Sequence, residues 1–298
     1  MSSADPPIDY IARTHAWYGA LGYPPYRYAE HAEAPFAPLG RPLAEARVAL
    51  LTTAAPYRPE LGDQGPGAAY NAAAKFYAVW SGDAAAEHDL RVSHVAVDQA
   101  HLSDDQNCWF PLPALRRAAA AGRIGEVAAR FHGVPTNRSQ RQTREVDARE
   151  VVARVREDGA DTAVLVANCP VCHQSMTLVA RALEAAGVAT VVVGAAKDVV
   201  ERAGAPRFLF SDVPLGNAAG LPRDVASQDL VLELALRLLE EAAAPRTTWQ
   251  SPLRWPVAGW KRDYMNLEGL TPDEVARRRA ENEAARATAG AVQAATLR

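Results

Sequence analysis

The chain has 298 residues, which is enough for one large α/β domain or for two smaller units that each have a core. Hydrophobic residues make up 49% of the sequence and charged residues 22%, a balance that excludes wholesale disorder, and the net charge of -3 argues against a dedicated nucleic-acid-binding protein. Three cysteines are too few for a disulfide scaffold. The first residues lack a signal-peptide pattern, and no apolar stretch reaches the length of about 18 residues that a membrane span needs. We therefore expect a cytoplasmic protein that binds neither membrane nor nucleic acid.

Residues 1–45 are predicted to form an irregular N-terminal arm that is rich in Pro and aromatic side chains. So many exposed aromatic residues would be unusual on a protein surface, so we expect them to be buried against the domain or another subunit. The aromatic residues of the arm include Trp17, Tyr18, Tyr23, Tyr26, Tyr28 and Phe36.

Residues 46–150 are predicted to form the first α/β part. The apolar run 47–53 predicts a buried parallel strand, and a second strand is expected at 89–97. The remaining expected elements are a short helix at 113–121, a helical turn at 125–130 and a polar loop at 132–144.

Residues 151–245 are predicted to form the second α/β part, in which apolar strands alternate with helices. The expected strands are 162–167, 188–194 and 207–211, and the expected helices are 145–157, 175–186, 196–202 and 225–244. Such alternation is typical of a parallel sheet covered on both faces. We therefore predict an α/β fold of two similar halves, each a parallel sheet flanked by helices, with the active site in the cleft at the carboxyl ends of the strands.

Residues 246–298 are predicted to form a C-terminal tail and helix. The tail is expected to be irregular to residue 270 and carries Trp249, Trp255 and Trp260. Thr271 and Pro272 have the pattern of a helix start. The helix after them is polar on nearly all faces, so we expect it to extend into solvent or to contact a partner.

Two of the three cysteines, Cys169 and Cys172, form a Cys-Pro-Val-Cys motif between a predicted strand and a predicted helix. The N-terminus of a helix has unpaired N–H groups and a partial positive charge, which both favour thiolate over thiol. The adjacent His173 could add positive charge or accept a proton. The motif therefore indicates a nucleophilic or redox-active thiol pair, with Cys169, Cys172 and His173 as candidate catalytic residues.

Two other interpretations of the motif stay open. The pair is one half of a zinc or iron site, completed by Cys108 or by a histidine such as His94, or it is two inert cysteines in a buried turn. The sequence has no second Cys-x-x-Cys, so a metal is not the favoured interpretation. A thioredoxin-like domain does not fit, because the motif lies in the middle of a larger α/β array.

Polar residues also gather at and after two other predicted strands. His94 and Asp98 have a spacing that suits an acid/base pair or contacts with a substrate amine. Gly216, which follows the predicted strand 207–211, lets the backbone approach a ligand closely. Asp212, which follows the same strand, is a polar contact or a helix cap. We therefore predict these substrate-binding residues: His94, Asp98, Asp105, Asn107, Asp212 and Gly216.

Several separated motifs between about residues 45 and 240 point together to one family. They are Asp158-Gly-Ala-Asp161, Cys169-Pro-Val-Cys172-His-Gln-Ser, Leu183-Glu-Ala-Ala-Gly187, Asp105-Gln-Asn107 with Phe110-Pro111, Gly122-Arg-Ile-Gly125 and Asp212-Val-Pro-Leu-Gly216. This set resembles the selenoprotein B family, whose members are subunits of the glycine, sarcosine, betaine and D-proline reductases.

The resemblance implies a mechanism and a set of partners. In that family the first position of the motif is typically selenocysteine, whose selenolate displaces an amine that a pyruvoyl-carrying partner subunit activates. The resemblance places Cys169 at that position as the nucleophile and Cys172 as the resolving thiol. An external dithiol or thioredoxin-type reductant would then regenerate the pair.

Sulfur is a weaker nucleophile and a poorer leaving group than selenium, so the substrate of a cysteine member is expected to react more easily. We therefore expect a reductase that cleaves a C–N, C–S or related bond in a small amino-acid-like substrate. The alternatives are a metal-dependent enzyme and a non-catalytic subunit of a multi-protein reductase. The expected partners are the small-molecule substrate, a reductase subunit and further copies of the chain in a homo-oligomer.

Overall fold

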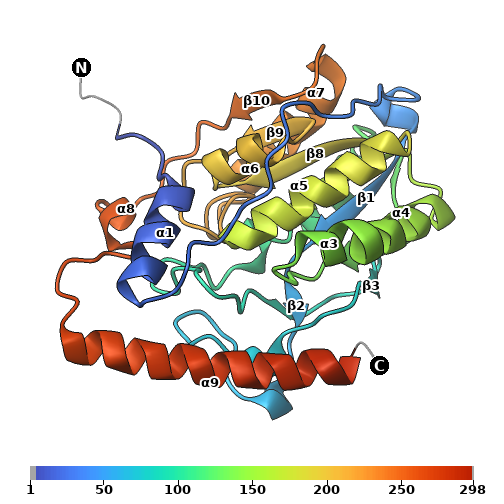
Figure 1. Ribbon diagram of the computed structural model, residues 1–298. Helices are drawn as coiled ribbons and strands as arrows, with labels where there is room; N and C mark the ends of the chain where they lie inside the picture. The colour runs from blue at the N-terminus through green and yellow to red at the C-terminus, as the bar shows by residue number, and fades with distance from the viewer. Residues whose placement is uncertain (1–4, 297–298) are drawn as a thin grey trace.

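The computed structural model describes residues 5–296 and is built around one mostly parallel sheet with helices on both faces (Figure 1). Seven strands follow one another in the order β10-β9-β8-β7-β1-β6-β3, and β5 also pairs with β1. The edge strand β3 is antiparallel to β6, and the other pairs are parallel. The strands of this sheet are β1 (Arg47–Thr52), β3 (Trp80–Asp83), β5 (Glu126–Val127), β6 (Arg130–Gly133), β7 (Thr162–Val166), β8 (Ala189–Gly194), β9 (Arg207–Phe210) and β10 (Thr247–Gln250).

Short antiparallel strands form a separate sheet of β2 (Ala55–Pro56) and β4 (Leu90–Arg91). The helices are α1 (Tyr10–Ala20), α2 (Leu112–Ala120), α3 (Gln140–Gln142), α4 (Ala148–Glu157), α5 (Pro170–Ala185), α6 (Lys197–Ala203), α7 (Val225–Glu241), α8 (Trp260–Asp263) and α9 (Pro272–Thr296). A π-helical stretch (Thr143–Asp147) precedes α4, and single 3₁₀ turns lie at Leu43–Glu45, Pro59–Leu61, Ala72–Ala74 and Gln106–Cys108.

The two faces of the sheet have separate cores, which explains why the central strands are apolar at nearly every position. Leu51 and Leu165 pack on the side of α4 and α5, and Leu50 and Val164 pack on the side of α2 and α7. Successive side chains of a strand point to opposite faces, so both positions of each pair are buried. In Figure 1, α4 and α5 lie in front of the sheet and α7 lies behind it.

The predicted α/β class and the parallel central sheet are confirmed. The arrangement of two similar halves is not confirmed, because the strands of both parts join in a single sheet. β1 pairs with β7 along its length, from Val48 opposite Thr162 to Thr52 opposite Val166.

Several predicted elements are wrong, all where the sequence is short or irregular. The segment 125–130 is not helical but contains β5 and leads into β6, because Gly125 lies directly against the backbone of Glu45, where a Cβ would come within 2.6 Å. Only Leu90–Arg91 of the expected strand 89–97 is extended, and it lies outside the main sheet. The tail also contains β10, which extends the sheet beyond β9.

The N-terminal arm contains α1, which the sequence analysis did not predict. The Asp9 side chain caps this helix by accepting a hydrogen bond from the Ala12 N–H at 2.8 Å. The seven Phe, Trp and Tyr residues of the arm, Tyr10 included, are buried or half-buried, as expected, and they pack within this chain. Trp17 lies under the guanidinium of Arg278, so the first part of α9 contacts α1, and α9 also packs against the 3₁₀ turn Ala72–Ala74 rather than extending freely.

Among residues 5–296, none of the helices combines the length and apolar character that crossing a lipid bilayer requires.

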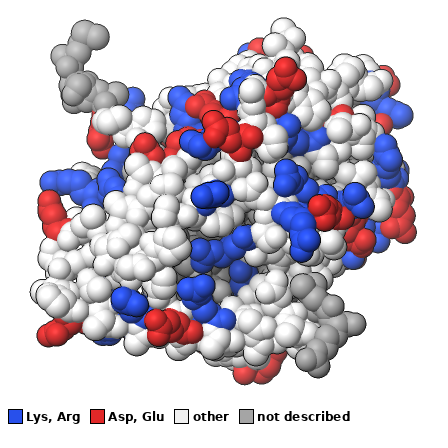
Figure 2. Space-filling model, in the orientation of Figure 1, with Lys and Arg blue, Asp and Glu red and all other residues white. Residues whose placement is uncertain are grey.

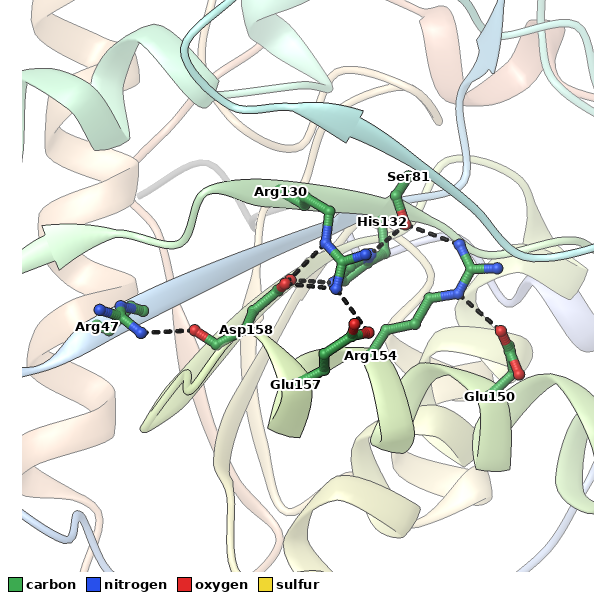
Figure 3. Close-up of polar contacts among 8 residues, drawn as sticks. All are labelled: Arg47, Ser81, Arg130, His132, Glu150, Arg154, Glu157 and Asp158. Atoms are coloured by element: carbon green, nitrogen blue, oxygen red, sulfur yellow. Dashed lines mark hydrogen bonds and ion pairs between the residues drawn. The ribbon is translucent and has the colours of Figure 1, made fainter.

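A polar network holds the edge of the sheet against α4 (Figure 3). The hydroxyl of Ser81 in β3 lies 2.8 Å from Nδ1 of His132 in β6, and Nε2 of His132 lies 2.9 Å from Asp158 at the end of α4. Arg130 donates to the same aspartate, and Arg154 donates to the Ser81 hydroxyl. These contacts join β3, β6 and α4, so side-chain hydrogen bonds hold the short edge strand β3 in addition to its backbone pairing with β6.

A buried ion pair fastens the N-terminal arm to the second part of the sheet. Arg207 of β9 donates to Glu184 of α5 at 2.8 Å, and the two side chains are 1% and 0% exposed. Glu184 also accepts hydrogen bonds from the backbone N–H groups of Ala37 and Thr190, while Arg207 donates to the Ala37 carbonyl. The pair therefore holds the arm at Ala37 from both sides.

We predict that Arg207→Met lowers the free energy of unfolding by about 3–5 kcal/mol, because the substitution leaves the Glu184 carboxylate buried without its cation. Urea denaturation measures the change, and limited proteolysis of the arm near Ala37 is expected to become faster. The control is Arg237→Met, which breaks an exposed pair with Glu241 and is expected to cost less than about 1 kcal/mol. Equal losses in the two variants would contradict the prediction.

Candidate functional site

The candidate site lies at the carboxyl ends of β1, β6, β7 and β8. The chain leaves β7 into α5 on one face of the sheet, whereas the connection that follows β1 contains α2, which packs on the other face. Adjacent parallel strands with connections on opposite faces create the crevice in which open α/β sheets bind ligands. The Cys-Pro-Val-Cys motif follows β7, directly beside the end of β1.

The two cysteines occupy the first turn of α5. Cys169 is the N-cap residue, Pro170 is the first helical residue, and the helix therefore begins before the predicted Ser175. The Cys172 N–H donates to the Cys169 sulfur at 3.1 Å, and a disulfide bond joins Cys169 and Cys172. A sulfur at this position satisfies an N–H that the helix leaves unpaired, and in the reduced state the same N–H favours a thiolate.

The two sulfurs have different surroundings. Cys169 is 3% exposed and lines a pocket, whereas Cys172 is fully buried and is not among the pocket-lining residues. The Cys172 sulfur lies 3.3 Å from the Thr136 hydroxyl, which comes from the segment after β6. A molecule in the pocket therefore meets Cys169 first, with Cys172 behind it.

His94 lies against the cysteine pair. One of its ring nitrogens and the two sulfurs all lie within 4.8 Å of one another. Its Nε2 lies 2.7 Å from the Thr53 carbonyl at the end of β1, so Nε2 carries the proton and Nδ1 keeps a free lone pair. Burial lowers the pKa of His94 to about 4, and His94 is thus a neutral imidazole near pH 7.

His173 has a different environment, because backbone groups engage both of its nitrogens. Nδ1 lies 2.7 Å from the Cys169 carbonyl, and Nε2 accepts hydrogen bonds from the N–H groups of Ala195 and Ala196. Burial lowers its pKa to about 4. A Cβ at Gly194 would come within 2.5 Å of the ring, so glycine is needed there. His173 therefore positions the start of α5 against the end of β8, and a catalytic role for it stays a prediction.

The pocket in front of Cys169 is partly open to solvent. Its walls come from α1, the N-terminal arm, the segment before β3, the segment after β4, the segment after β6 and the start of α5. Tyrosine is the most frequent residue type, and its other polar residues include two cations and two histidines. The residues of these types are Tyr18, Tyr26, Tyr28, Tyr70, Lys75, Arg138, His15 and His94.

The cations make the pocket attractive to anions. Burial and the charge of Arg138 lower the pKa of Lys75 to about 8, while the Lys75 ammonium lies 4.9 Å from the centre of the Tyr77 ring. The Arg138 guanidinium lies 5.6 Å from the centre of the Tyr26 ring. Figure 2 shows that Lys and Arg side chains gather on the face that carries α1, the start of α5 and α9. A bound carboxylate would relieve the repulsion between the two pocket cations.

Two residues of the pocket wall have left-handed backbone conformations that non-glycine residues rarely adopt. Ala96 has φ 68° and Arg138 has φ 55°. The Tyr264 hydroxyl holds the Ala96 carbonyl at 3.0 Å. Strained backbone of this kind is found where the surrounding structure fixes a functional geometry.

The other predicted substrate-binding residues make different contacts. Asp105 accepts from the backbone N–H of Arg223 and from Gln228, and Asp212 pairs with Lys261 at 2.7 Å. The contacts of Asp105 hold the first part against the second, and the pair of Asp212 and Lys261 holds the C-terminal tail against the second part. Asp98, Asn107 and Gly216 also do not line the pocket of Cys169, and substrate contact by any of the five stays a prediction.

Cys108 is separate from the cluster of His94, Cys169 and Cys172 in the part of the chain that the structure describes. It is fully buried in the core on the side of α2 and α7. Burial raises the pKa of its thiol to about 12, which is typical of an inert core cysteine.

Sequence reasoning missed most of the pocket. Tyr70, Lys75, Thr136 and Arg138 lie in irregular segments without periodicity, and they reach the site only through the path of the chain. Thr53 acts through its backbone carbonyl, which leaves no signal in the sequence. The one usable signal was the rarity of lysine, because Lys75 is one of only three lysines in the chain.

Comparison with known proteins gives one relevant similarity. The chain is 32% identical over 174 residues to the D-proline reductase subunit gamma of Acetoanaerobium sticklandii, an alignment that covers 58% of this chain and 72% of that protein. No protein-family model and no solved structure matches the chain.

We predict that iodoacetamide modifies Cys169 of the reduced protein before Cys172 and Cys108. The reason is that Cys169 faces the pocket at a helix N-terminus, whereas both other cysteines are fully buried. Peptide mapping by mass spectrometry after short reaction times measures the order. Modification of Cys108 or Cys172 at the same rate as Cys169 would contradict this assignment.

We also predict that the contribution of His94 and His173 to stability falls as the pH decreases from 6.5 towards 4. The folded-state pKa of His94 and of His173 is about 4, so the unfolded chain binds protons in this range that the folded chain does not. His94→Gln is therefore expected to flatten the dependence of the unfolding free energy on pH by up to about 1.4 kcal/mol per pH unit.

Urea denaturation between about pH 4.5 and 6, the interval between the folded and ordinary histidine pKa values, measures this slope. Asp147 and Asp198 act in the opposite sense, because burial raises their pKa values to about 6 and about 7. Their contribution is common to both proteins, so the difference in slope isolates His94. If the wild type and His94→Gln have identical slopes, His94 is charged in the folded protein over this pH interval, which would contradict the prediction.

Proposed function

Because the chain belongs to the glycine/proline reductase family, we propose that it is a thiol-dependent reductase for a small amino-acid-like substrate. In this proposal Cys169 is the nucleophile, Cys172 is the resolving thiol, and the bond that breaks is C–N, C–S or a related bond. An external dithiol supplies the electrons.

One observation carries the proposal. The motif places Cys169 at the N-cap of α5 and at the wall of the pocket, with Cys172 fully buried behind it and within bonding distance. A nucleophile must reach the substrate and a resolving thiol must reach only the nucleophile, and this arrangement supports both requirements.

The first step is displacement at carbon. The start of α5 favours loss of the Cys169 proton to the solvent that reaches the pocket, and the thiolate attacks the substrate carbon while the bond to the leaving group breaks. The leaving group takes the electron pair of that bond and a proton. The product of the step is a thioether between the substrate carbon and Cys169.

The second step is reduction of the carbon. The Cys172 thiolate attacks the Cys169 sulfur, the carbon–sulfur bond breaks, and the carbon keeps the electron pair and takes a proton. The cysteines become the disulfide that the structure contains. Two thiols of the external reductant then return the pair to its reduced form and are themselves oxidised to a disulfide.

The pocket supports an amino-acid-like substrate. Lys75 and Arg138 would pair with its carboxylate, and the tyrosine rings would enclose its carbon skeleton. Positive charge near the carboxylate also stabilises negative charge that develops at the neighbouring carbon in the second step. Orientation by the two cations would leave the reacting carbon facing Cys169.

A partner subunit belongs to the proposal. The similar protein is named as a subunit, so we propose that this chain also works with a further reductase component in a reducing cytoplasm. A non-catalytic role within such an assembly is the competing function, because a name as subunit does not assign the chemistry. The expected homo-oligomer stays a prediction.

The proposal predicts opposite outcomes for the two cysteines when the chain is incubated with dithiothreitol and a panel of amino acids that includes D-proline. Cys172→Ser is expected to accumulate a substrate adduct on Cys169, because the resolving thiol is missing. Cys169→Ser is expected to form no adduct and to lose turnover entirely. Intact-protein mass spectrometry detects the adduct, and Cys108→Ser is the matched control that keeps wild-type behaviour.

Full activity of Cys169→Ser would overturn the proposed nucleophile. Turnover by the isolated wild-type chain with only a dithiol would exclude the purely non-catalytic role.

A further inference from the structure

We propose that the reduced protein binds Zn²⁺ through Cys169, Cys172 and His94, with the fourth coordination position open to the pocket, and that the bound metal reversibly masks the nucleophile. This inference concerns the regulation of the proposed function and rests on Cys169 being the reacting thiol. The disulfide form of the protein lacks the site, because its sulfurs are bonded to each other.

The three donor atoms are already gathered. One His94 nitrogen and both sulfurs lie within 4.8 Å of one another, and all three residues are buried. In a tetrahedral zinc site with Zn–S of about 2.3 Å and Zn–N of about 2.1 Å, donor atoms lie roughly 3.6–3.8 Å apart. Opening the disulfide separates the sulfurs towards this spacing, with the Cα atoms held 4.8 Å apart at the start of α5.

Groups around the three donors orient them for a metal. The Thr53 carbonyl takes the Nε2–H of His94, which leaves Nδ1 as the metal-binding nitrogen. The Cys172 N–H donates to the Cys169 sulfur, and the Thr136 hydroxyl lies against the Cys172 sulfur. A metal-bound histidine with a carbonyl partner and thiolates with hydrogen-bond donors are the usual outer shell of zinc sites.

The charge of the site also fits a divalent soft cation. Two thiolates and a neutral imidazole balance the charge of Zn²⁺, so the buried complex has no net charge. This balance matters because Lys75 and Arg138 line the same pocket and would repel a site with excess positive charge. Sulfur and imidazole donors favour zinc over magnesium or calcium.

The open position follows from the placement of Cys169. Because Cys169 and His94 line the pocket and Cys172 lies behind them, the fourth ligand of the metal comes from the pocket as water or a small anion. A set of two cysteines and one histidine with one exchangeable ligand is found in catalytic zinc sites. In this protein the bound Zn²⁺ would occupy the lone pair of the Cys169 sulfur that attacks the substrate.

Redox state then controls metal binding in a balanced sequence. Reduction of the disulfide by two external thiols yields two protein thiols and one external disulfide. Binding of Zn²⁺ by these thiols releases two protons and forms two Zn–S bonds. A chelator that removes the metal and returns the protons restores the free dithiol.

The test uses untagged full-length protein that has been stripped of metal and divided into a reduced and a disulfide sample. Zn²⁺ is titrated into each sample in competition with a chromophoric chelator, and Co²⁺ is used in parallel for its thiolate charge-transfer absorption. We expect one Zn²⁺ per reduced chain, none in the disulfide sample, and at least a tenfold slower reaction of Cys169 with iodoacetamide when Zn²⁺ is bound.

Two variants sharpen the result. His94→Gln keeps a donor for the Thr53 carbonyl but removes the nitrogen ligand, so its affinity for Zn²⁺ is expected to fall by more than the roughly 10–100-fold that loss of an outer-shell partner costs. Cys108→Ser, which lies outside the cluster, is expected to bind Zn²⁺ like the wild type. If His94→Gln does not fold, the redox comparison and the cobalt spectrum of the wild type decide the matter.

Equal Zn²⁺ binding by the reduced and disulfide samples would overturn the inference, as would wild-type affinity in a folded His94→Gln protein. Formation of a substrate adduct on Cys169 in metal-free protein tests the proposed function separately. A protein that forms the adduct but binds no zinc refutes only the metal site, and a protein that binds zinc but never forms the adduct refutes the proposed nucleophile.

Discussion

The start of α5 is held by the sulfur of Cys169, which accepts the N–H of Cys172 where a helix leaves that group unpaired. Pro170 occupies the first helical position, where no N–H is required. This junction places both thiols at the carboxyl end of β7 and directs one of them into the pocket. His173 extends the constraint to the end of β8, since its Nε2 accepts the N–H groups of Ala195 and Ala196. Any shift in where the helix begins would therefore displace both thiols from the pocket and from His94.

His94 and His173, which lie close to the motif, are both buried and neutral, but they differ in whether a ring nitrogen is left without a backbone partner. Both nitrogens of His173 are engaged by backbone groups, so it has no free lone pair for a proton or a metal. Nε2 of His94 is held by the Thr53 carbonyl, so its Nδ1 keeps a lone pair, which is the nitrogen that the proposed metal site uses. The N-terminal arm forms part of the same pocket: Tyr26 and Tyr28 line it, and the buried pair of Glu184 and Arg207 fastens the chain that follows them.

The sequence predicts those parts of the fold that depend on local patterns. Apolar runs such as 162–167 and 188–194 correspond to β7 and β8, because a strand buried on both faces needs apolar residues at each position. The local pattern of segment 125–130 predicts a helix wrongly, since its pairing with β1 depends on chain neighbours far away in the sequence. The same limit applies to the site. The cysteine spacing and His94 are visible in the sequence, whereas Lys75 and Arg138 come from loops whose path no local pattern determines.

In the proposed function sulfur takes the place of selenium, which makes the surroundings of Cys169 more important. A thiol needs a base or a positive electrostatic environment to react as a thiolate, and the N-terminus of α5 supplies the positive environment at Cys169. The proposed cleavage of a carbon–sulfur bond would place an electron pair on carbon, which is unfavourable unless an adjacent group delocalises the charge. Cations that bind a carboxylate beside that carbon would lower this barrier, and Lys75 and Arg138 lie where they can do so. The pocket would therefore favour substrates whose reacting carbon is attached directly to a carboxylate over those with a more distant one.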